Sequence, residues 1–165
     1  MTYAPAILVA ALFFTTPVLS ADIVGRASTV DGDTIEIHGQ RIRLWGVDAP
    51  EAGQSCAGLQ DRNHAVQRSW RCGKAAADTL DDMLASARPT SCEAVDTDRY
   101  GRTVARCAAG GRDVARMMVE KGLAVDYPQY SKGAYADAER EAKAARRGMW
   151  AGTFVMPWDW RKGAR

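Results

Sequence analysis

Alternation of apolar and polar residues predicts short strands in the first third of the chain. Every second residue is apolar over residues 34–37 and again over 41–45, which is typical of strands with one buried face. The Asp-Gly pair within residues 30–33 and the glycine at position 39 favour tight turns before and between these strands. Pro50 ends the extended run, because it has no N–H group to give to a neighbouring strand.

Helical periodicity begins later in the chain. Three segments place apolar residues three or four positions apart and are followed by glycine or by proline, so they are predicted as helices: residues 73–87, 112–121 and 135–147. Three more strands are predicted, one before the first turn and two on either side of Gly101: residues 23–30, 91–95 and 103–107.

Charged residues stand at the ends of the early strands, where side chains from different strands can meet. Asp33 and Asp48 are hard oxygen ligands suited to Ca²⁺ or Mg²⁺, and the main-chain carbonyl of Ala49 could join them. Glu51 beside a metal is suited to activate water as a general base. Arg43 offers a planar fork of donors that matches phosphate oxygens. Together these groups suit attack on a phosphodiester.

Simpler explanations exist for the same residues. Asp-Gly is first of all a turn signal, and charges on strands usually face the solvent. The acidic turn is not an EF-hand loop, because the later ligands and the closing glutamate of that motif are missing. The net charge of +2 is only mildly basic and no long block of like charge appears, so electrostatics alone does not indicate a nucleic-acid binder.

Three ordered segments, residues 31–34, 43–51 and 98–102, resemble the staphylococcal nuclease (thermonuclease) family, and the similarity extends from about residue 23 to residue 150. The resemblance implies an α+β fold in which five strands close into an OB-fold barrel surrounded by three helices. It also implies a Ca²⁺-dependent phosphodiesterase that hydrolyses DNA and RNA. Cleavage of the 5′ P–O bond, leaving 3′-phosphate products, is implied as well.

The resemblance also implies roles for single residues. Carried over by position, the Ca²⁺ ligands would be two carboxylates and one main-chain oxygen: Asp33, Asp48 and the carbonyl of Ala49. Glu51 would be the general base, and Arg43 and Arg102 would bind the phosphate as catalytic arginines. Family members often have threonine where this chain has Ala49. Because the ligand there is a backbone carbonyl, the difference leaves the ligand set unchanged.

Aromatic residues and a further arginine are candidates for contacts with the nucleotide. Arg99 and Tyr100 lie beside Arg102 at the predicted hairpin tip, where an aromatic ring can stack a base and the arginines can hold phosphates. Tyr130 and Tyr127 fall in a stretch where the family places tyrosines beside the nucleotide, although plain packing would explain either of them.

The first 21 residues are predicted to be an export signal. An apolar run over residues 6–19 is followed by small residues and is too short for a comfortable membrane span. The absence of Lys or Arg before this run leaves an uncleaved anchor as the alternative. The domain organisation expected is a signal at 1–21, a nuclease-like domain at 22–152 and a tail at 153–165 that packs on the domain. The mature protein is expected to be periplasmic or secreted.

Four cysteines in an exported chain predict disulfides. Three connectivities are open, and we favour two: Cys56 with Cys72, and Cys92 with Cys107, the second joining adjacent antiparallel strands. Each bridge would close a loop of about fifteen residues, worth ~3 kcal/mol in the chain-entropy model. A zinc site formed by Cys56, His64 and Cys72 is the alternative, but its spacing matches no known zinc motif.

The segment over residues 52–71 is polar, without a period, and is expected to be a loop. Its arginines and histidine either approach a polyanion or are simply solvated: Arg62, His64, Arg68 and Arg71. The partners expected are DNA and RNA as substrates, with no stable protein partner, no membrane in the mature form and a monomeric state. Two other classes stay open, a non-catalytic OB-fold nucleic-acid-binding module and a disulfide-stabilised secreted structural domain.

Overall fold

The computed structural model describes residues 22–58 and 69–164. The predicted export signal and three of the residues from the polar segment, Arg62, His64 and Arg68, lie outside these ranges. None of the helices in the described ranges combines the length and the apolar character that crossing a membrane would require.

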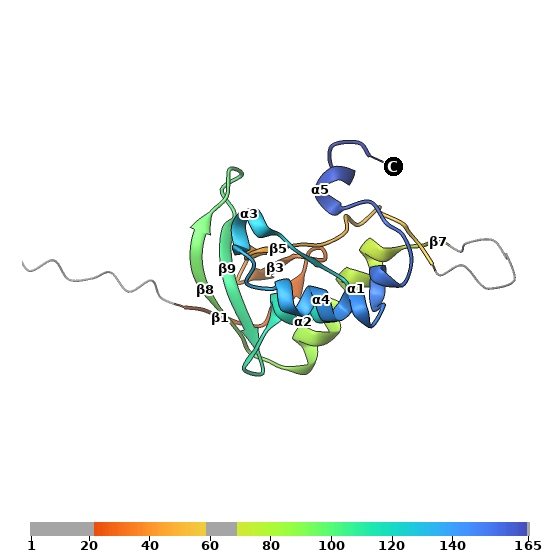
Figure 1. Ribbon diagram of the computed structural model, residues 1–165. Helices are drawn as coiled ribbons and strands as arrows, with labels where there is room; N and C mark the ends of the chain where they lie inside the picture. The colour runs from red at the N-terminus through yellow and green to blue at the C-terminus, as the bar shows by residue number, and fades with distance from the viewer. Residues whose placement is uncertain (1–21, 59–68, 165) are drawn as a thin grey trace, which may run out of the picture.

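Two hairpins form the centre of the main sheet. The first pairs β3 (Thr34–Ile37) with β4 (Gln40–Leu44), and the second pairs β8 (Thr90–Thr97) with β9 (Thr103–Ala109). A parallel contact between β4 and β9 joins the two hairpins, and the β8–β9 hairpin is seen at the left of Figure 1. In this register Arg43 lies opposite both Thr34 and Val104, so the predicted phosphate arginine is on a central strand.

The N-terminal strand closes the sheet on itself. The predicted single strand over residues 23–30 is divided at Arg26 into β1 (Ile23–Gly25) and β2 (Ala27–Thr29). The strand order is β1-β8-β9-β4-β3-β2, so two strands that are consecutive in the chain lie at opposite edges. Two edge strands can be directly connected in this way only if the sheet curls and brings its edges together. The structure therefore confirms the predicted α+β fold with an OB-like, curled sheet.

Three main helices accompany the sheet: α1 (Cys72–Ser86), α2 (Val114–Glu120) and α4 (Ala136–Ala144). The predicted helix start at residue 112 is wrong, because Arg112–Asp113 form the short strand β10 on β9. Asp113 then caps α2 by accepting a hydrogen bond from the Arg116 N–H. The largest fully buried side chains come from sheet and helices alike: Ile35, Ile37, Ile42, Leu44, Leu80, Leu84 and Met118.

Short elements fill the segments between these parts. β5 (Val47–Asp48) pairs with β11 (Val125–Asp126), and α3 (Pro128–Ser131) follows. The polar segment expected to be a loop contributes β6 (Cys56–Ala57) and β7 (Ser69–Trp70), which pair with each other. After the 3₁₀ turn η1 (Gly148–Ala151) comes a short helix in the tail, α5 (Pro157–Trp160).

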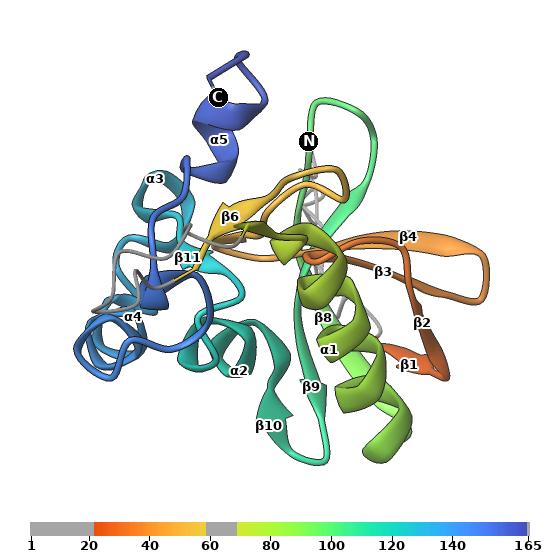
Figure 2. The same cartoon turned by 90° about the vertical axis from the view of Figure 1, so that its right-hand side faces the viewer.

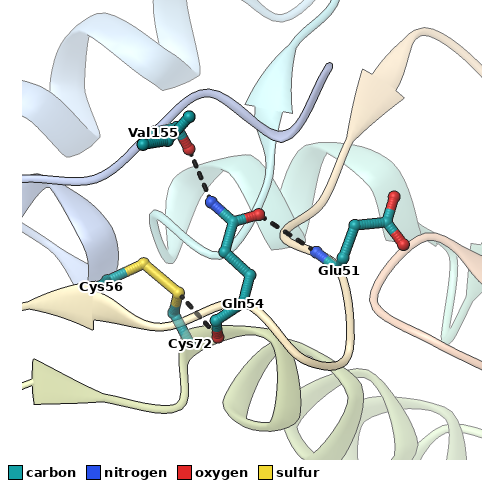
Figure 3. The surroundings of a disulfide bond; sticks show 5 residues. All are labelled: Glu51, Gln54, Cys56, Cys72 and Val155. Atoms are coloured by element: carbon teal, nitrogen blue, oxygen red, sulfur yellow. Dashed lines mark hydrogen bonds between the residues drawn. A yellow bond between two sulfur atoms is a disulfide. The ribbon is translucent and has the colours of Figure 1, made fainter. Parts of the chain in front are cut away.

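Both favoured disulfides are present. Cys92–Cys107 bridges neighbouring positions of β8 and β9, and Cys56–Cys72 ties β6 to the start of α1 (Figure 3). Because Cys56 and Cys72 are bonded to each other, the zinc alternative loses its thiolate ligands. The Cys56–Cys72 bridge belongs to a second apolar cluster, against which tail residues pack: Phe154, Met156 and Trp158.

Candidate active site

Four of the predicted site residues lie on β3, β4, β5 and the turns beside them. Asp33 immediately precedes β3, and its carbonyl accepts a hydrogen bond of 2.8 Å from the Leu44 N–H on β4. This backbone bond sets Asp33 next to Arg43. Asp48 is the last residue of β5, and Glu51 follows Pro50 in the next turn.

Arg43 draws the two aspartates together. Its Nη1 lies 2.6 Å from Asp33 Oδ1 and its Nη2 lies 2.8 Å from Asp48 Oδ1. Asp33 is 4% exposed and Asp48 is 0% exposed, so the ion pairs form largely away from water. The side chains of Asp33 and Asp48 therefore converge on the Arg43 guanidinium.

The electrostatic state of Asp33 reflects its burial. Burial raises the pKa of Asp33 to about 7, although Arg43 acts in the opposite direction. The carboxylate also accepts hydrogen bonds from the Ala49 N–H at 3.1 Å and from the Thr34 hydroxyl at 3.2 Å. A buried carboxylate with so high a pKa is incompletely compensated, and further positive charge beside it would be favourable.

Glu51 is held by its own loop rather than by a strand. Its N–H donates to Gln54 Oε1 at 3.3 Å, and its carbonyl accepts from the Gln54 N–H at 2.7 Å (Figure 3). Gly73 at the start of α1 allows this loop to approach closely, since a Cβ there would lie 1.7 Å from the Glu51 carbonyl oxygen. The Glu51 side chain itself is 39% exposed, which leaves it accessible to water.

A fifth residue of the site comes from the tail and was missed by sequence analysis. Arg161 follows α5, and its Nη2 lies 2.8 Å from Asp48 Oδ2 while its Nη1 lies 2.8 Å from Glu51 Oε1. Burial acts against the charged form, but Asp48 and Glu51 raise the pKa of Arg161. No sequence pattern pairs Arg161 with residues more than a hundred positions earlier. We refer to Asp33, Arg43, Asp48, Glu51 and Arg161 as the rim cluster.

The arginines and the tyrosine of the β8–β9 hairpin lie outside the rim cluster. The Nε of Arg102 lies 2.7 Å from Asp98 Oδ2, and the Arg99 guanidinium lies 4.8 Å from the centre of the Tyr100 ring. Burial opposes ionisation of Asp98, but hydrogen bonds from Arg102 and Tyr100 lower its pKa. Tyr100 is 69% exposed. The hairpin tip therefore presents an open aromatic ring between two arginines.

Tyr127 and Tyr130 lie together at the start of α3. The Tyr127 N–H donates to the Gly46 carbonyl at 2.9 Å, which places it beside the β4–β5 turn. Its ring stacks on Trp158 of α5 with centroids 5.1 Å apart, and it contacts Tyr130 edge to face. Tyr130 is 54% exposed. One tyrosine is thus covered by the tail and the other is open to solvent.

The donor set suits a hard cation in part. Two buried carboxylates and a nearby main-chain carbonyl are ligands that Ca²⁺ accepts, with water completing its coordination. Over residues 22–58 and 69–164 no three His, Cys, Asp or Glu side chains gather in a metal-binding arrangement. A cation would therefore rely on Asp33, Asp48, the carbonyl of Ala49 and solvent.

Comparison with known proteins connects this geometry to a family. A sequence profile described as "Staphylococcal nuclease homologue" matches residues 41–152. The chain is 46% identical over 145 residues to the "Succinoglycan biosynthesis protein ExoI" of Rhizobium meliloti (strain 1021), covering 87% of this chain and 73% of that protein.

Two further relatives carry nuclease names. The chain is 29% identical over 163 residues to the "Micrococcal nuclease" of Shigella flexneri, covering 88% of this chain and 84% of the other. It is 35% identical over 127 residues to the "Staphylococcal-like nuclease CAN1" of Arabidopsis thaliana. That match covers 76% of this chain but only 34% of the plant protein.

Proposed function

The chain belongs to the staphylococcal nuclease family, and from this premise we propose that it is a Ca²⁺-dependent phosphodiesterase acting on DNA and RNA. The observation that carries the proposal is the convergence of two buried aspartates on Arg43, with Glu51 beside them. A structural module would have no need to bury two carboxylates at one place, because their desolvation is costly.

Asp33, Asp48 and the Ala49 carbonyl would hold the cation. The high pKa of Asp33 supports this assignment, because a neighbouring cation would stabilise the ionised carboxylate. When bound, Ca²⁺ supplies Lewis-acid stabilisation of the negative charge that grows on the phosphoryl oxygens.

Glu51 would act as the general base. Its exposed carboxylate accepts a proton from a water molecule, and the water oxygen attacks phosphorus in line with the leaving oxygen. The new P–O bond forms as the bond to the 5′ oxygen breaks, and the 5′ oxygen takes up a proton from solvent. The products are a 3′-phosphate and a free 5′-hydroxyl, as the family resemblance implies.

Arg43 and Arg102 would donate to the non-bridging phosphate oxygens. In the structure the terminal nitrogens of Arg43 pair with Asp33 and Asp48. Arg102 pairs with Asp98 through its Nε, so its terminal nitrogens could bind a phosphate. Arg99, Tyr100 and Tyr130 would contact the neighbouring nucleotides through stacking and charge. Tyr127 would contact a nucleotide only when Trp158 no longer stacks on its ring.

An oxidising compartment fits the rest of the chain. Two disulfides in so small a protein favour a location outside the cytoplasm. The predicted signal at residues 1–21 supports export to the periplasm or the medium, where a nuclease meets nucleic acids from other cells. We expect the protein to act there as a monomer without a stable protein partner.

The decisive experiment is a nuclease assay on the purified, oxidised protein. We expect hydrolysis of single-stranded DNA with Ca²⁺, loss of hydrolysis with EDTA and recovery when Ca²⁺ is restored. Asp48→Asn should abolish the recovery, whereas Glu141→Gln on the exposed face of α4 should not affect it. Binding of DNA without hydrolysis under any of these conditions would replace the nuclease with a non-catalytic nucleic-acid-binding module.

A further inference from the structure

The tail forms a strap across the side of the molecule that carries the rim cluster. We call residues 153–164 the C-terminal strap. It begins at a β-bridge between Thr153 and Ala57 and continues to a hydrogen bond of 2.6 Å from Gln54 Nε2 to the Val155 carbonyl (Figure 3). Figure 2 shows its helix α5 above α3, away from α1. The strap is thus fixed to the same residue, Gln54, that holds the Glu51 loop.

The strap ends in the rim cluster. Arg43 engages Asp48 Oδ1, and Arg161 engages the oxygen that remains, Asp48 Oδ2, together with Glu51 Oε1. Three residues before Arg161, Trp158 stacks on Tyr127 at an interplanar angle of 18°. Both contacts are made by strap residues to groups that the proposed reaction uses.

The charges of the rim cluster explain why Arg161 lies there. When its three carboxylates are ionised, Arg43 leaves two negative charges uncompensated, and Arg161 neutralises one of them. A divalent cation would neutralise both. The guanidinium and the cation carry the same sign and would both bind the Asp48 carboxylate, of which Arg161 holds Oδ2, so their simultaneous binding is opposed by Coulomb repulsion at short range.

We propose that Arg161 competes with Ca²⁺ for Asp48, so that the docked strap is a closed state of the site and cation binding releases it. The inference rests on the proposed Ca²⁺ site. Docking also places the Arg161 guanidinium 2.8 Å from Glu51 Oε1 and stacks Trp158 on the Tyr127 ring. Arg161 lies outside residues 41–152, the part matched by the family profile.

Calcium affinity tests the competition directly. The apparent affinity of a site is reduced by the fraction of molecules in which it is blocked. Isothermal titration of the oxidised protein should therefore show Ca²⁺ binding about tenfold tighter in Arg161→Gln than in the parent, within the range of usual coupling between sites. Lys162→Gln is the matched control, because the Lys162 ammonium pairs with Asp159 within the strap, at 3.4 Å. It should bind Ca²⁺ as the parent does.

A second variant opens the strap without changing any group near the carboxylates. Trp158→Ala removes the stacking on Tyr127 and should also tighten Ca²⁺ binding, by severalfold. Hydrogen exchange adds a readout that does not depend on catalysis: saturating Ca²⁺ should speed exchange of the amides over residues 157–163 in the parent. Equal Ca²⁺ affinities in parent and Arg161→Gln, or slower exchange of the strap with Ca²⁺, would overturn the proposal.

DNA hydrolysis by the same variants separates this inference from the proposed function. Tighter Ca²⁺ binding in Arg161→Gln without hydrolysis by any variant would end the nuclease assignment and leave the competition standing. Hydrolysis that requires Ca²⁺, together with the same Ca²⁺ affinity in Arg161→Gln as in the parent, would support the nuclease assignment and end the competition. Absence of Ca²⁺ binding in parent, Arg161→Gln and Trp158→Ala alike would remove the competition, because no cation would then contest Asp48.

Discussion

At the scale of single residues, the proposed function would give Arg43 two tasks that the same donors cannot perform at the same time. In the structure its two terminal nitrogens pair with Asp33 and Asp48, whereas phosphate binding would require donors that point to the substrate. A cation between the aspartates would take over the first task and free the guanidinium for the second. Cation binding and substrate binding are therefore expected to be coupled through this one side chain.

Because Arg43 pairs with two buried aspartates, we expect a large loss of stability when it is removed. Arg43→Ala leaves the buried carboxylates of Asp33 and Asp48 without their shared partner, and removing one member of a buried ion pair costs about 3 kcal/mol or more. Urea unfolding without Ca²⁺ measures the change. Arg41 lies on the same strand and is exposed, so the stability of Arg41→Ala should stay within about 0.5 kcal/mol of that of the parent. Equal losses of stability in both variants would show that the ion pairs of Arg43 with the aspartates do not stabilise the fold.

The role of general base proposed for Glu51 predicts a catalytic defect when its carboxylate is removed. Glu51→Gln removes the proton acceptor but keeps the shape of the side chain, so kcat should fall about 10²–10⁴-fold, as for other general bases. Calcium affinity should change far less, because Glu51 is not among the proposed ligands. Steady-state hydrolysis of a fluorogenic oligonucleotide measures kcat, and Glu141→Gln serves as the control. Parent-like turnover in Glu51→Gln would mean that another group accepts the proton.

The candidate site could be predicted in outline, because its residues fall within short segments of recognisable spacing. Asp33, Arg43, Asp48 and Glu51 meet in the structure, although their roles stay predictions. Arg161 could not be found in this way. It is brought to Asp48 by the packing of aromatic residues and by the Gln54 bond to the tail, and neither leaves a local pattern in the sequence.

At the scale of elements, the ends of strands and helices depend on pairing with distant strands, which local propensity does not predict. Residues 23–30 are predicted as one strand, but the strand is divided at Arg26, so that β1 pairs with β8 and β2 with β3. Arg112 and Asp113 stand directly before the apolar residues that predict a helix from position 114 on, yet their backbone pairs with β9. In both cases hydrogen bonds to a distant strand decided the local conformation.

The junction between β10 and α2 therefore depends on Asp113. Its Oδ1 caps α2 at the Arg116 N–H, and its Oδ2 accepts a hydrogen bond of 3.1 Å from the buried Tyr135 hydroxyl. Asp113→Ala loses the cap and leaves the Tyr135 hydroxyl without its acceptor, which should lower stability by about 2 kcal/mol. Asp81→Ala on the exposed face of α1 is the control in the same thermal unfolding experiment. A loss below 0.5 kcal/mol for Asp113→Ala, the approximate limit for surface changes, would contradict this account.

The two disulfides close loops of similar length, 16 and 15 residues in sequence separation, and yet should differ in their effect on function. Each double replacement by alanine should cost about 3 kcal/mol in the chain-entropy model. Cys92 and Cys107 stay paired through the β8–β9 ladder, whereas Cys56 and Cys72 fasten the segment that follows the Glu51 loop. Hydrolysis below the melting temperature should therefore fall more in Cys56→Ala/Cys72→Ala. Equal activity in both double variants would show that the loop keeps its position without the bridge.

At the scale of the whole molecule, the curled sheet brings three separate segments to one end. In both views the β8–β9 hairpin tip and α5 project from the same end of the molecule (Figures 1 and 2). The rim cluster includes the arginine that follows α5, and the hairpin tip presents Arg99, Tyr100 and Arg102. With a net charge of only +2, binding of nucleic acid should depend on this local group of arginines rather than on a basic surface as a whole.

The salt dependence of DNA binding tests that idea. Each phosphate neutralised adds about 0.9 to the slope of log K against log salt on duplex DNA, so contacts by Arg43, Arg99 and Arg102 predict a slope of about −3. Fluorescence anisotropy with the Glu51→Gln protein and Ca²⁺ gives the slope without hydrolysis.

Replacing single cations then assigns the slope to positions on the molecule. Arg99→Gln should reduce its magnitude by about one unit, because one phosphate contact is lost. Lys74→Gln is the matched control: Lys74 lies on α1 and pairs there with Asp78, so its loss should leave the slope unchanged. A parent slope steeper than about −6, insensitive to Arg99→Gln, would mean that nucleic acid binds over a wider surface and that the hairpin tip does not direct it to the rim cluster.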